Sequence, residues 1–198
     1  MNKFITIIEK LCHKDVKFVK IGTVCTVVKG TQLNKEKMLN AGNYPVINGG
    51  IHASGFWNEF NANQNTIIIS QGGASAGYVN FIRTKFWAGA HCYVVQPKTQ
   101  IINKYLYYLL KNSQEIIMNS KKGAGIPALD KKAIYDIIIP LPSLEIQNKI
   151  VKILDKFTEL ETELETELEL RKKQYQYYRD KLLDFSTHTH TKGKHRMG

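Results

Sequence analysis

Residues Gly73–Gly77 form the pattern Gly-x-Ser-x-Gly, which presents a serine nucleophile in hydrolases when it follows a strand and leads into a helix. The next residues, Tyr78–Ile82, are β-branched and aromatic and predict a strand instead. A triad of that type also needs an aspartate and then a histidine downstream, and after Asp130 the only histidines lie at positions 188, 190 and 195. Catalysis by Ser75 is therefore disfavoured. Two interpretations remain: a plain hairpin turn, or a glycine loop whose backbone approaches a phosphate or a base edge.

Other reactive groups are not spaced for chemistry. His91-Cys92 and Cys12-His13 are adjacent pairs rather than metal-ligand spacings, and no phosphate-binding or dinucleotide glycine motif is present. We predict no catalytic residue, no metal and no cofactor in this chain. Three cysteines without Cys-x-x-Cys spacing favour a reducing cytoplasm, and no apolar run is long enough to span a membrane.

Positive charge is concentrated in the first part of the chain. The 198 residues carry 28 Lys and Arg against 17 Asp and Glu, a net charge of +11. Residues 1–143 hold 17 basic and 7 acidic residues, a balance of +10, whereas residues 144–198 hold 11 and 10. A basic domain attracts polyanions, of which nucleic acid is the commonest.

Four loops in this basic part carry side chains suited to phosphates and base edges, although each could also be an ordinary solvated loop. The candidate DNA-binding residues are Lys29, Thr31, Gln32, Asn48, His52, Gln71, Gly72, Gly73, Ser75, Lys121 and Lys122.

The elements expected to position these loops form an α+β domain, residues 1–143, dominated by short strands. Strands are predicted for Val16–Lys29, Thr66–Ser70, Tyr78–Ile82, Cys92–Gln96 and Ile137–Ile139, and turn residues flank a short apolar piece at Val46–Ile47. Helical spacing of Tyr105, Leu106, Leu109, Leu110, Ile116 and Ile117 predicts one helix between Asn103 and Asn119.

A single long helix is predicted for residues 144–186, with Ser143 as its N-cap. Its apolar seam has heptad spacing and predicts a coiled coil, with one stutter between Leu164 and Leu168. The seam residues are Ile146, Ile150, Ile153, Phe157, Leu160, Leu164, Leu168, Tyr175, Tyr178 and Leu182. Three tandem Thr-Glu-Leu-Glu repeats fill 158–169, and each repeat advances the helix by roughly 6 Å.

The seam predicts a partner helix, from a second copy or another protein, because no other segment of the chain is long enough to cover it; the alternative is an exposed, charged helix that frays. Residues 187–198 alternate Thr and His and then become basic, which predicts a disordered tail.

The combination resembles the DNA specificity subunit of type I restriction-modification systems. The resemblance rests on Gly72–Val79, Gly125–Lys132, the run Ile137–Pro142, and the helix start Gln147-x-x-Ile-Val-x-x-Leu-Asp, and it extends over roughly residues 16–185. It implies a target-recognition domain that reads half of a bipartite site in double-stranded DNA. It also implies a spacer helix that pairs with a second such helix and binds modification (methyltransferase) subunits.

Chemistry in that family belongs to the modification and restriction subunits, with their S-adenosylmethionine, ATP and Mg²⁺. Full-length members carry two recognition domains and two helices, whereas this sequence carries one of each. The resemblance therefore predicts a half-size subunit that forms a homodimer or pairs with another half-subunit, or else an inactive truncated product. A coiled-coil dimer that binds nucleic acid without sequence preference is the alternative.

Overall fold

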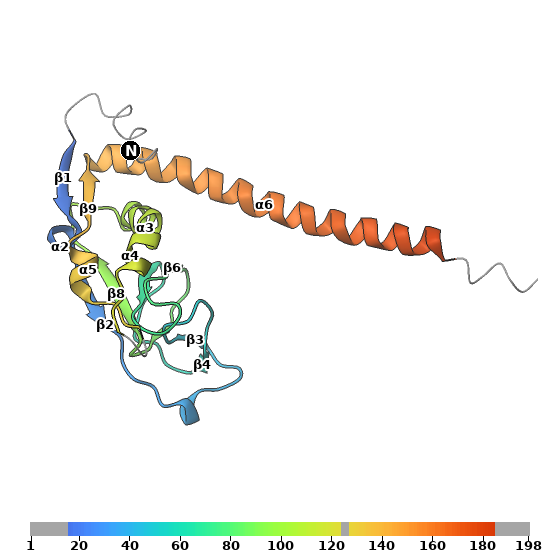
Figure 1. Cartoon of the computed structure of the whole chain (residues 1–198), viewed down its shortest axis with the longest axis horizontal. Helices are drawn as coiled ribbons and strands as arrows, with labels where there is room; N and C mark the ends of the chain where they lie inside the picture. The colour runs from blue at the N-terminus through green and yellow to red at the C-terminus, as the bar shows by residue number, and fades with distance from the viewer. Residues whose placement is uncertain (1–15, 124–126, 185–198) are drawn as a thin grey trace, which may run out of the picture. The chain divides into compact units, whose positions relative to one another are not determined.

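The computed structural model describes residues 16–123 and 127–184. Two compact units result, Met1–Val151 and Lys152–Gly198. The α+β class is confirmed: a β-rich domain is followed by one long helix (Figure 1). The strands are β1 (Lys17–Lys20), β2 (Cys25–Lys29), β3 (Tyr44–Ile47), β4 (Gly55–Trp57), β5 (Thr66–Ser70), β6 (Val79–Ile82), β7 (Trp87–Ala88), β8 (Cys92–Pro97) and β9 (Ile138–Leu141). The helices are α2 (Ile21–Val24), a 3-10 turn η1 (Lys35–Lys37), α3 (Asn103–Asn112), α4 (Gln114–Asn119), α5 (Lys131–Tyr135) and α6 (Leu144–Leu183).

The main sheet has four antiparallel strands in the order β2-β8-β5-β6. β5 lies inside the sheet and is bordered on both sides, with Ile67 opposite Val95 of β8 and Phe81 of β6. Its apolar run is buried, as its composition predicts, because a strand covered on both faces needs no polar alternation. The predicted strand Thr66–Ser70 is confirmed residue for residue.

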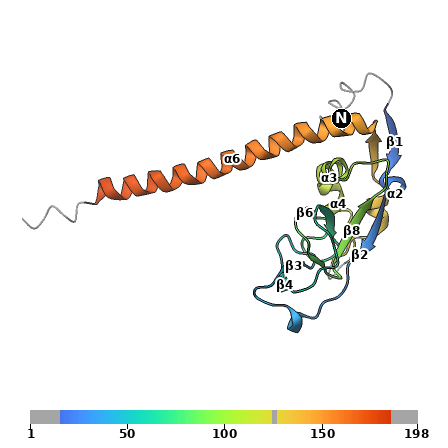
Figure 2. The same ribbon diagram turned by 180° about the vertical axis from the view of Figure 1, so that it is seen from behind.

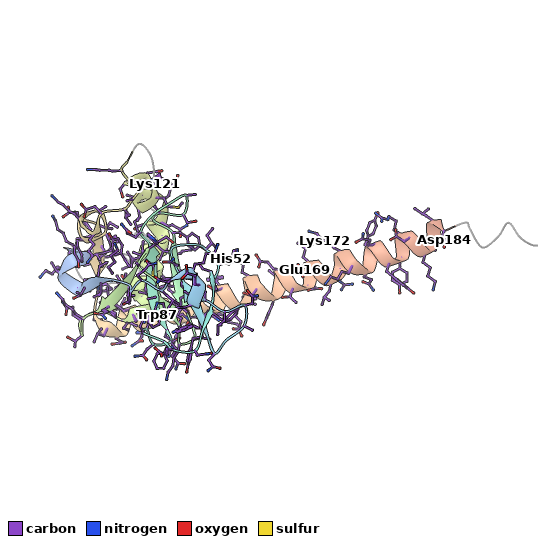
Figure 3. All side chains as sticks on the ribbon, turned by 90° about the horizontal axis from the view of Figure 1, so that it is seen from below. His52, Trp87, Lys121, Glu169, Lys172 and Asp184 are labelled. Atoms are coloured by element: carbon purple, nitrogen blue, oxygen red, sulfur yellow. The ribbon has the colours of Figure 1, made fainter. Side chains whose placement is uncertain are left out.

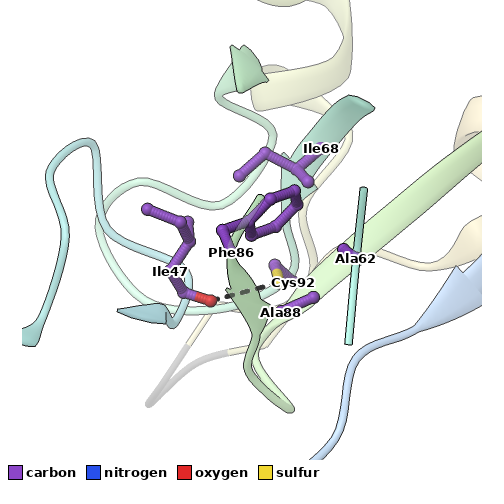
Figure 4. Packing of buried hydrophobic residues seen from close by; sticks show 6 residues of the cluster. All are labelled: Ile47, Ala62, Ile68, Phe86, Ala88 and Cys92. Carbon is purple, nitrogen blue, oxygen red and sulfur yellow. Dashed lines mark hydrogen bonds between the residues drawn. The ribbon is translucent and has the colours of Figure 1, made fainter. Parts of the chain in front are cut away.

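A smaller sheet, β4-β3-β7, adjoins the main one and pairs β3 with β7 in parallel. Between the two sheets lies a buried cluster of six residues, shown in Figure 4: Ile47, Ala62, Ile68, Phe86, Ala88 and Cys92. The Cys92 thiol donates to the carbonyls of Ile47 and Gly89, at 3.4 and 3.1 Å. Burial raises the pKa of Cys92 to about 11, so this thiol serves packing and is not a nucleophile.

The prediction of one strand over Val16–Lys29 is wrong. The segment divides into β1, the helical turn α2, and β2. β1 pairs with β9 and β2 pairs with β8, so the chain must change sheets between them. The turn places Ile21 and Val24 in the core, which local composition alone could not distinguish from strand burial.

The single helix predicted between Asn103 and Asn119 is likewise wrong: α3 and α4 meet at Ser113. The side chain of Gln114, the first residue of α4, accepts a hydrogen bond from the backbone of Val79 in β6. This hydrogen bond ties the start of α4 to the main sheet. Ile116 is 69% exposed and does not belong to the buried face that its spacing predicted.

Helix α6 begins at Leu144, and Ser143 Oγ accepts from the amide of Ile146 at 3.4 Å, as an N-cap does. It ends at Leu183, with Asp184 outside it. Residues 185–186 of the predicted helix and the predicted tail, 187–198, lie outside the described residues. No helix in the described parts of the chain is long and apolar enough to cross a bilayer.

Candidate nucleic-acid interface

Three of the four predicted loops meet around the turn Gly89–His91, at the end of the main sheet where β2 and β5 end and β8 begins; we call this end the edge. Figures 1 and 2 show β2 and β8 side by side in this sheet. The Gln71 amide donates to the His91 carbonyl at 2.8 Å, and the His91 amide donates to Asn48 Oδ1 at 3.2 Å. The Thr31 amide donates to the carbonyl of Ala88 at 2.8 Å. Segments that are 20 to 60 residues apart in sequence are thus joined through one turn.

The fourth loop joins this edge through the segment Pro127–Leu129. Lys122 and Ala128 exchange backbone hydrogen bonds, both 2.9 Å long. On the other side of this segment the Gly73 amide donates to the Pro127 carbonyl at 3.0 Å, and the Leu129 amide donates to the Gln71 carbonyl at 2.8 Å. The backbone around Lys122 is therefore tied to the glycine loop.

The glycines of these loops have two different surroundings. A Cβ on Gly30 would lie 2.6 Å from the Ala88 carbonyl oxygen and would also collide with the backbone oxygen of Gly89. Gly73, with φ of 76°, has open space at the same position. Gly30 thus allows two loops to pack together, whereas Gly73 leaves its backbone open to a ligand.

The candidate side chains differ in exposure. The exposed candidates are Lys29, Thr31, Gln32, His52 and Lys122. The partly buried candidates are Asn48, Gln71, Gly72, Gly73, Ser75 and Lys121. Asn48 already accepts from His91, and Gln32 Nε2 donates to the Leu33 carbonyl at 3.3 Å. In Figure 3 Lys121 lies far from Trp87, whose Nε1 donates to the Thr31 carbonyl at 3.1 Å. The candidates therefore line an extended edge rather than a compact patch.

The Gln71 side chain interacts with a buried tyrosine of the domain. The buried Tyr93 hydroxyl donates to the Leu129 carbonyl at 2.9 Å. Burial raises the pKa of Tyr93, the charge of Asp130 raises it further, and a hydrogen bond from the Gln71 side chain opposes both. The Gln71 side chain thus interacts with the tyrosine hydroxyl beneath the loops.

The geometry disfavours the serine-nucleophile interpretation. Gly73–Gly77 form a turn, with the Tyr78 amide donating to the Ser75 carbonyl at 2.9 Å, and β6 follows instead of a helix. Within residues 16–123 and 127–184, no three His, Cys, Asp or Glu side chains gather into a metal site.

The sequence reasoning missed the turn at the centre of the edge. His91 is exposed and its backbone bonds to both Asn48 and Gln71, but in the sequence it stands out only through the pair His91-Cys92, which is not a metal-ligand spacing. The available signal was Gly89, which stands between two short apolar segments and marks a turn.

Along α6 the predicted seam divides into a buried and an exposed part. Ile150 is 3% exposed within the globular unit, so it is not available to a second helix, and its assignment to the pairing seam is corrected. Gln147 is fully buried; its Oε1 accepts from the Ile102 amide at 2.8 Å and its Nε2 donates to the Pro142 carbonyl at 2.9 Å. Ile146 is partly buried.

Beyond Val151 every predicted seam residue is at least 40% exposed: Ile153, Phe157, Leu160, Leu164, Leu168, Tyr175, Tyr178 and Leu182. Figure 3 shows Glu169 and Lys172 on the same part of the helix. Large side chains exposed at heptad spacing are characteristic of an interaction surface.

A family model described as the type I restriction modification DNA specificity domain matches residues 13–170. A putative type I restriction enzyme specificity subunit of Haemophilus influenzae is 33% identical over 192 residues, which cover 90% of this chain and 49% of that protein. A putative type I specificity subunit of Mycoplasma pneumoniae is 34% identical over 175 residues, covering 85% of this chain and 46% of that one.

Among solved structures, the S subunit of a type I restriction-modification system from M. genitalium superposes with a TM-score of 0.71 at 29% identity. The superposition covers 88% of this chain and 48% of that one. The chain thus spans about half the length of these relatives.

Proposed function

The chain belongs to the type I restriction-modification DNA specificity family, and from that premise we propose that its globular domain, residues 1–143, reads one half of a bipartite site in double-stranded DNA. The observation that carries this proposal is the meeting of four polar loops at one edge of a basic domain. Backbone bonds fix those loops relative to one another. A preorganised edge supports recognition because little conformational freedom is lost on binding.

Within this edge the residues would divide by chemistry. Lys29, Lys121 and Lys122 suit phosphates, which supply affinity without sequence information. Thr31, Gln32, His52 and Ser75 suit base edges, and the open backbone at Gly73 permits close approach. Asn48 and Gln71 would act mainly by holding the loops, because their side chains bond to other segments of the domain, whereas Gln32 bonds only to its neighbour Leu33.

The exposed seam of α6 would pair with a second specificity helix, from another copy of this chain or from another recognition half. The paired helices would set the distance between two half-sites and bind modification subunits, to which a restriction subunit would be added. The chain would be non-catalytic: S-adenosylmethionine, ATP and Mg²⁺ would act on those partners, in the cytoplasm.

Methylation mapping tests the proposal. Genomic base methylation would be compared with this gene present and with it deleted, and one bipartite motif should lose methylation on deletion. If no motif changes, the purified chain with its modification subunit must show sequence-specific DNA binding for the proposal to stand. Failure of both tests would contradict it and would favour an inactive truncated product.

Adding one Thr-Glu-Leu-Glu repeat separates the two parts of the proposal. The spacing of the methylated motif should increase, because the helix grows by roughly 6 Å, while the half-site bases stay the same. A change in the bases would contradict the spacer role of the helix. Replacing the repeat by a different four-residue helical sequence of the same length is the matched control.

The charge balance of +10 over residues 1–143 favours a second candidate, a binder without sequence preference. That protein would show a steep decrease of affinity with salt and equal affinity for all duplexes. Competition between a duplex containing the mapped motif and a scrambled duplex of equal length distinguishes the two functions.

A further inference from the structure

An exposed apolar side chain, Ile51, lies within one of the loops proposed to read DNA. The loop spans residues 48–54 and joins β3 to β4, and Ile51 at its centre is 46% exposed. Its neighbour His52 is a candidate base contact and is exposed as well. Phe18 and Ile138 are also exposed, but they belong to β1 and β9, which form a separate two-stranded sheet. Ile51 is thus an apolar group that a polar loop presents to the partner of that loop.

The base of the loop is fixed by contacts on both sides. The Ser54 amide donates to the Val46 carbonyl at 2.8 Å, which closes the hairpin between β3 and β4. Asn48 Oδ1 accepts from the His91 amide at 3.2 Å. Gly49, with φ of 85°, lies so close to the neighbouring turn that a Cβ would be 2.7 Å from the His91 carbonyl oxygen. These contacts fix the position of the loop relative to the rest of the edge.

The tip of the loop has no such packing. A Cβ on Gly50 would meet only atoms of His52, in the same loop, at 3.3 Å or more. Residues 51–54 are all exposed. A fixed base with an uncovered tip holds the apolar side chain in water, where its exposure is unfavourable. That exposure is removed when a partner covers Ile51.

A DNA duplex, the partner of this edge in the proposed function, offers an apolar environment between its stacked base pairs. Proteins that bend DNA insert Ile, Leu, Phe, Met or Pro side chains between two base pairs, and the duplex is kinked at that step. Polar neighbours of the inserted side chain contact base edges and phosphates at the same time. An exposed isoleucine beside His52, in a loop whose base is fixed, matches this mode of contact.

We propose that Ile51 inserts between two adjacent base pairs of the half-site and kinks the duplex there. The inference rests on the proposed function, because it takes the loop edge as the surface that reads DNA. Insertion costs least at pyrimidine–purine steps, TA and CA, which are unstacked most easily. Ile51 therefore adds a preference for such a step without a hydrogen bond to any base.

Two fluorescence measurements test the insertion, with the full chain and its modification subunit bound to a duplex that carries the methylated motif. Energy transfer between dyes at the duplex ends should show a bend of about 20–90°. The base analogue 2-aminopurine, placed in turn at each adenine of the half-site, should brighten at one step, where its stacking is lost. Ile51→Ala should abolish both signals. Ile51→Leu should keep both, because leucine is an apolar side chain of similar size.

Ile138→Ala is the matched control. Ile138 has the same side chain and is 65% exposed, but it lies on β9. Figures 1 and 2 show β1 and β9 at the end of the domain away from β3 and β4. The bend and the 2-aminopurine signal should therefore equal those of the parent chain. Urea unfolding of both variants should show that the domain remains folded.

Affinities separate the preference for a flexible step from ordinary base contacts. Ile51→Ala should change the affinity for the motif by less than about tenfold, because the lost burial of the side chain and the saved cost of unstacking oppose each other. Replacing the TA or CA step by the stiffer AA step should cost the parent chain about tenfold more affinity than it costs Ile51→Ala.

Sequence-specific binding of an unbent duplex by the parent chain would overturn the insertion and leave the proposed function intact. A bend that Ile51→Ala retains would overturn it as well. Weaker association of Ile51→Ala with the modification subunit, with the bend unchanged, would assign the side chain to a protein contact instead. Absence of any sequence-specific binding would contradict the proposed function, and this inference with it.

Discussion

The loop edge of the globular unit is held by contacts between residues distant in sequence, whereas the helix beyond Val151 is held by contacts between near neighbours. His91 bonds to Asn48, 43 positions away, and closes the edge with other backbone bonds. In the helix the hydroxyls of Thr158, Thr162 and Thr166 each donate to the carbonyl four residues earlier. The edge is therefore a tertiary structure, and the helix is a repeated local one.

This difference predicts that the edge and the helix respond in opposite ways to added atoms or inserted residues. At a packed position of the edge such as Gly30, a new atom meets atoms from another segment, so it disturbs more than one loop. A four-residue insertion in the helix meets only the neighbouring turns and is accommodated by lengthening. In the proposed function, the edge would read a fixed site and the helix would set a spacing that can vary.

The largest effect is expected from Gly30→Ala, which should show how tightly the edge is packed. The new methyl group would collide with the backbone of Ala88 and Gly89, which cannot move without shifting the turn. We expect a loss of about 3 kcal/mol, the upper end of overpacking costs, measured by urea unfolding. The melting temperature should decrease by roughly 6–12 °C. An unchanged unfolding midpoint would show that the loops are not packed as described.

Leu164→Asp tests the helix, where the parent side chain is 67% exposed within a single chain. Unfolding of the globular unit should be unaffected, but helix pairing should weaken by about 2 kcal/mol or more per substituted chain, since a buried leucine is lost. Light scattering should show a lower mass. Leu170→Asp is the control, because Leu170 is 61% exposed but lies off the seam. Equal masses for the parent and Leu164→Asp would count against pairing through this seam.

Gly73→Ala should destabilise the fold less than Gly30→Ala does, and it should also weaken the binding of DNA. Space is open at this position, so the expected loss is about 1 kcal/mol, from the positive φ alone. If DNA approaches this backbone, affinity for the recognised duplex should decrease by roughly tenfold, the scale of one lost base contact. Titration of labelled duplex by fluorescence anisotropy measures it. Wild-type affinity in this variant would place the contact surface elsewhere on the edge.

The smallest effect is expected from the exposed ion pair between Lys20 and Asp136, which links β1 to the residue after α5 at 2.7 Å. The hydrogen bond from Lys20 lowers the pKa of Asp136 below its ordinary value of 3.8. Because the pKa of Asp136 is lower in the folded chain, its carboxylate stabilises the fold at any pH above the ordinary pKa. This stabilisation is lost as the pH falls through the lowered pKa. Urea unfolding of the parent and Lys20→Met should differ slightly at pH 7 and converge in acid. A difference that persisted in acid would show that the charge is not its cause.

Much of this molecule could be predicted from local patterns. The heptad spacing determines the long helix and its apolar face, because periodicity in a helix depends only on neighbouring turns. The buried run Thr66–Ser70 determines a strand, and the basic composition of residues 1–143 indicates a polyanion as partner. The same reasoning selected four loops whose residue types are suited to DNA, and their role in binding stays a prediction.

The tertiary structure decided which of these parts meet. The change of sheets at Ile21–Val24, the division of the helix at Ser113 and the burial of Ile150 all depend on segments far away in sequence. So does the central place of His91 at the loop edge. A local pattern reports which face of an element is apolar, but the neighbour that covers this face is set by strand order and packing. Those depend on the free energy of the whole fold rather than on any single segment.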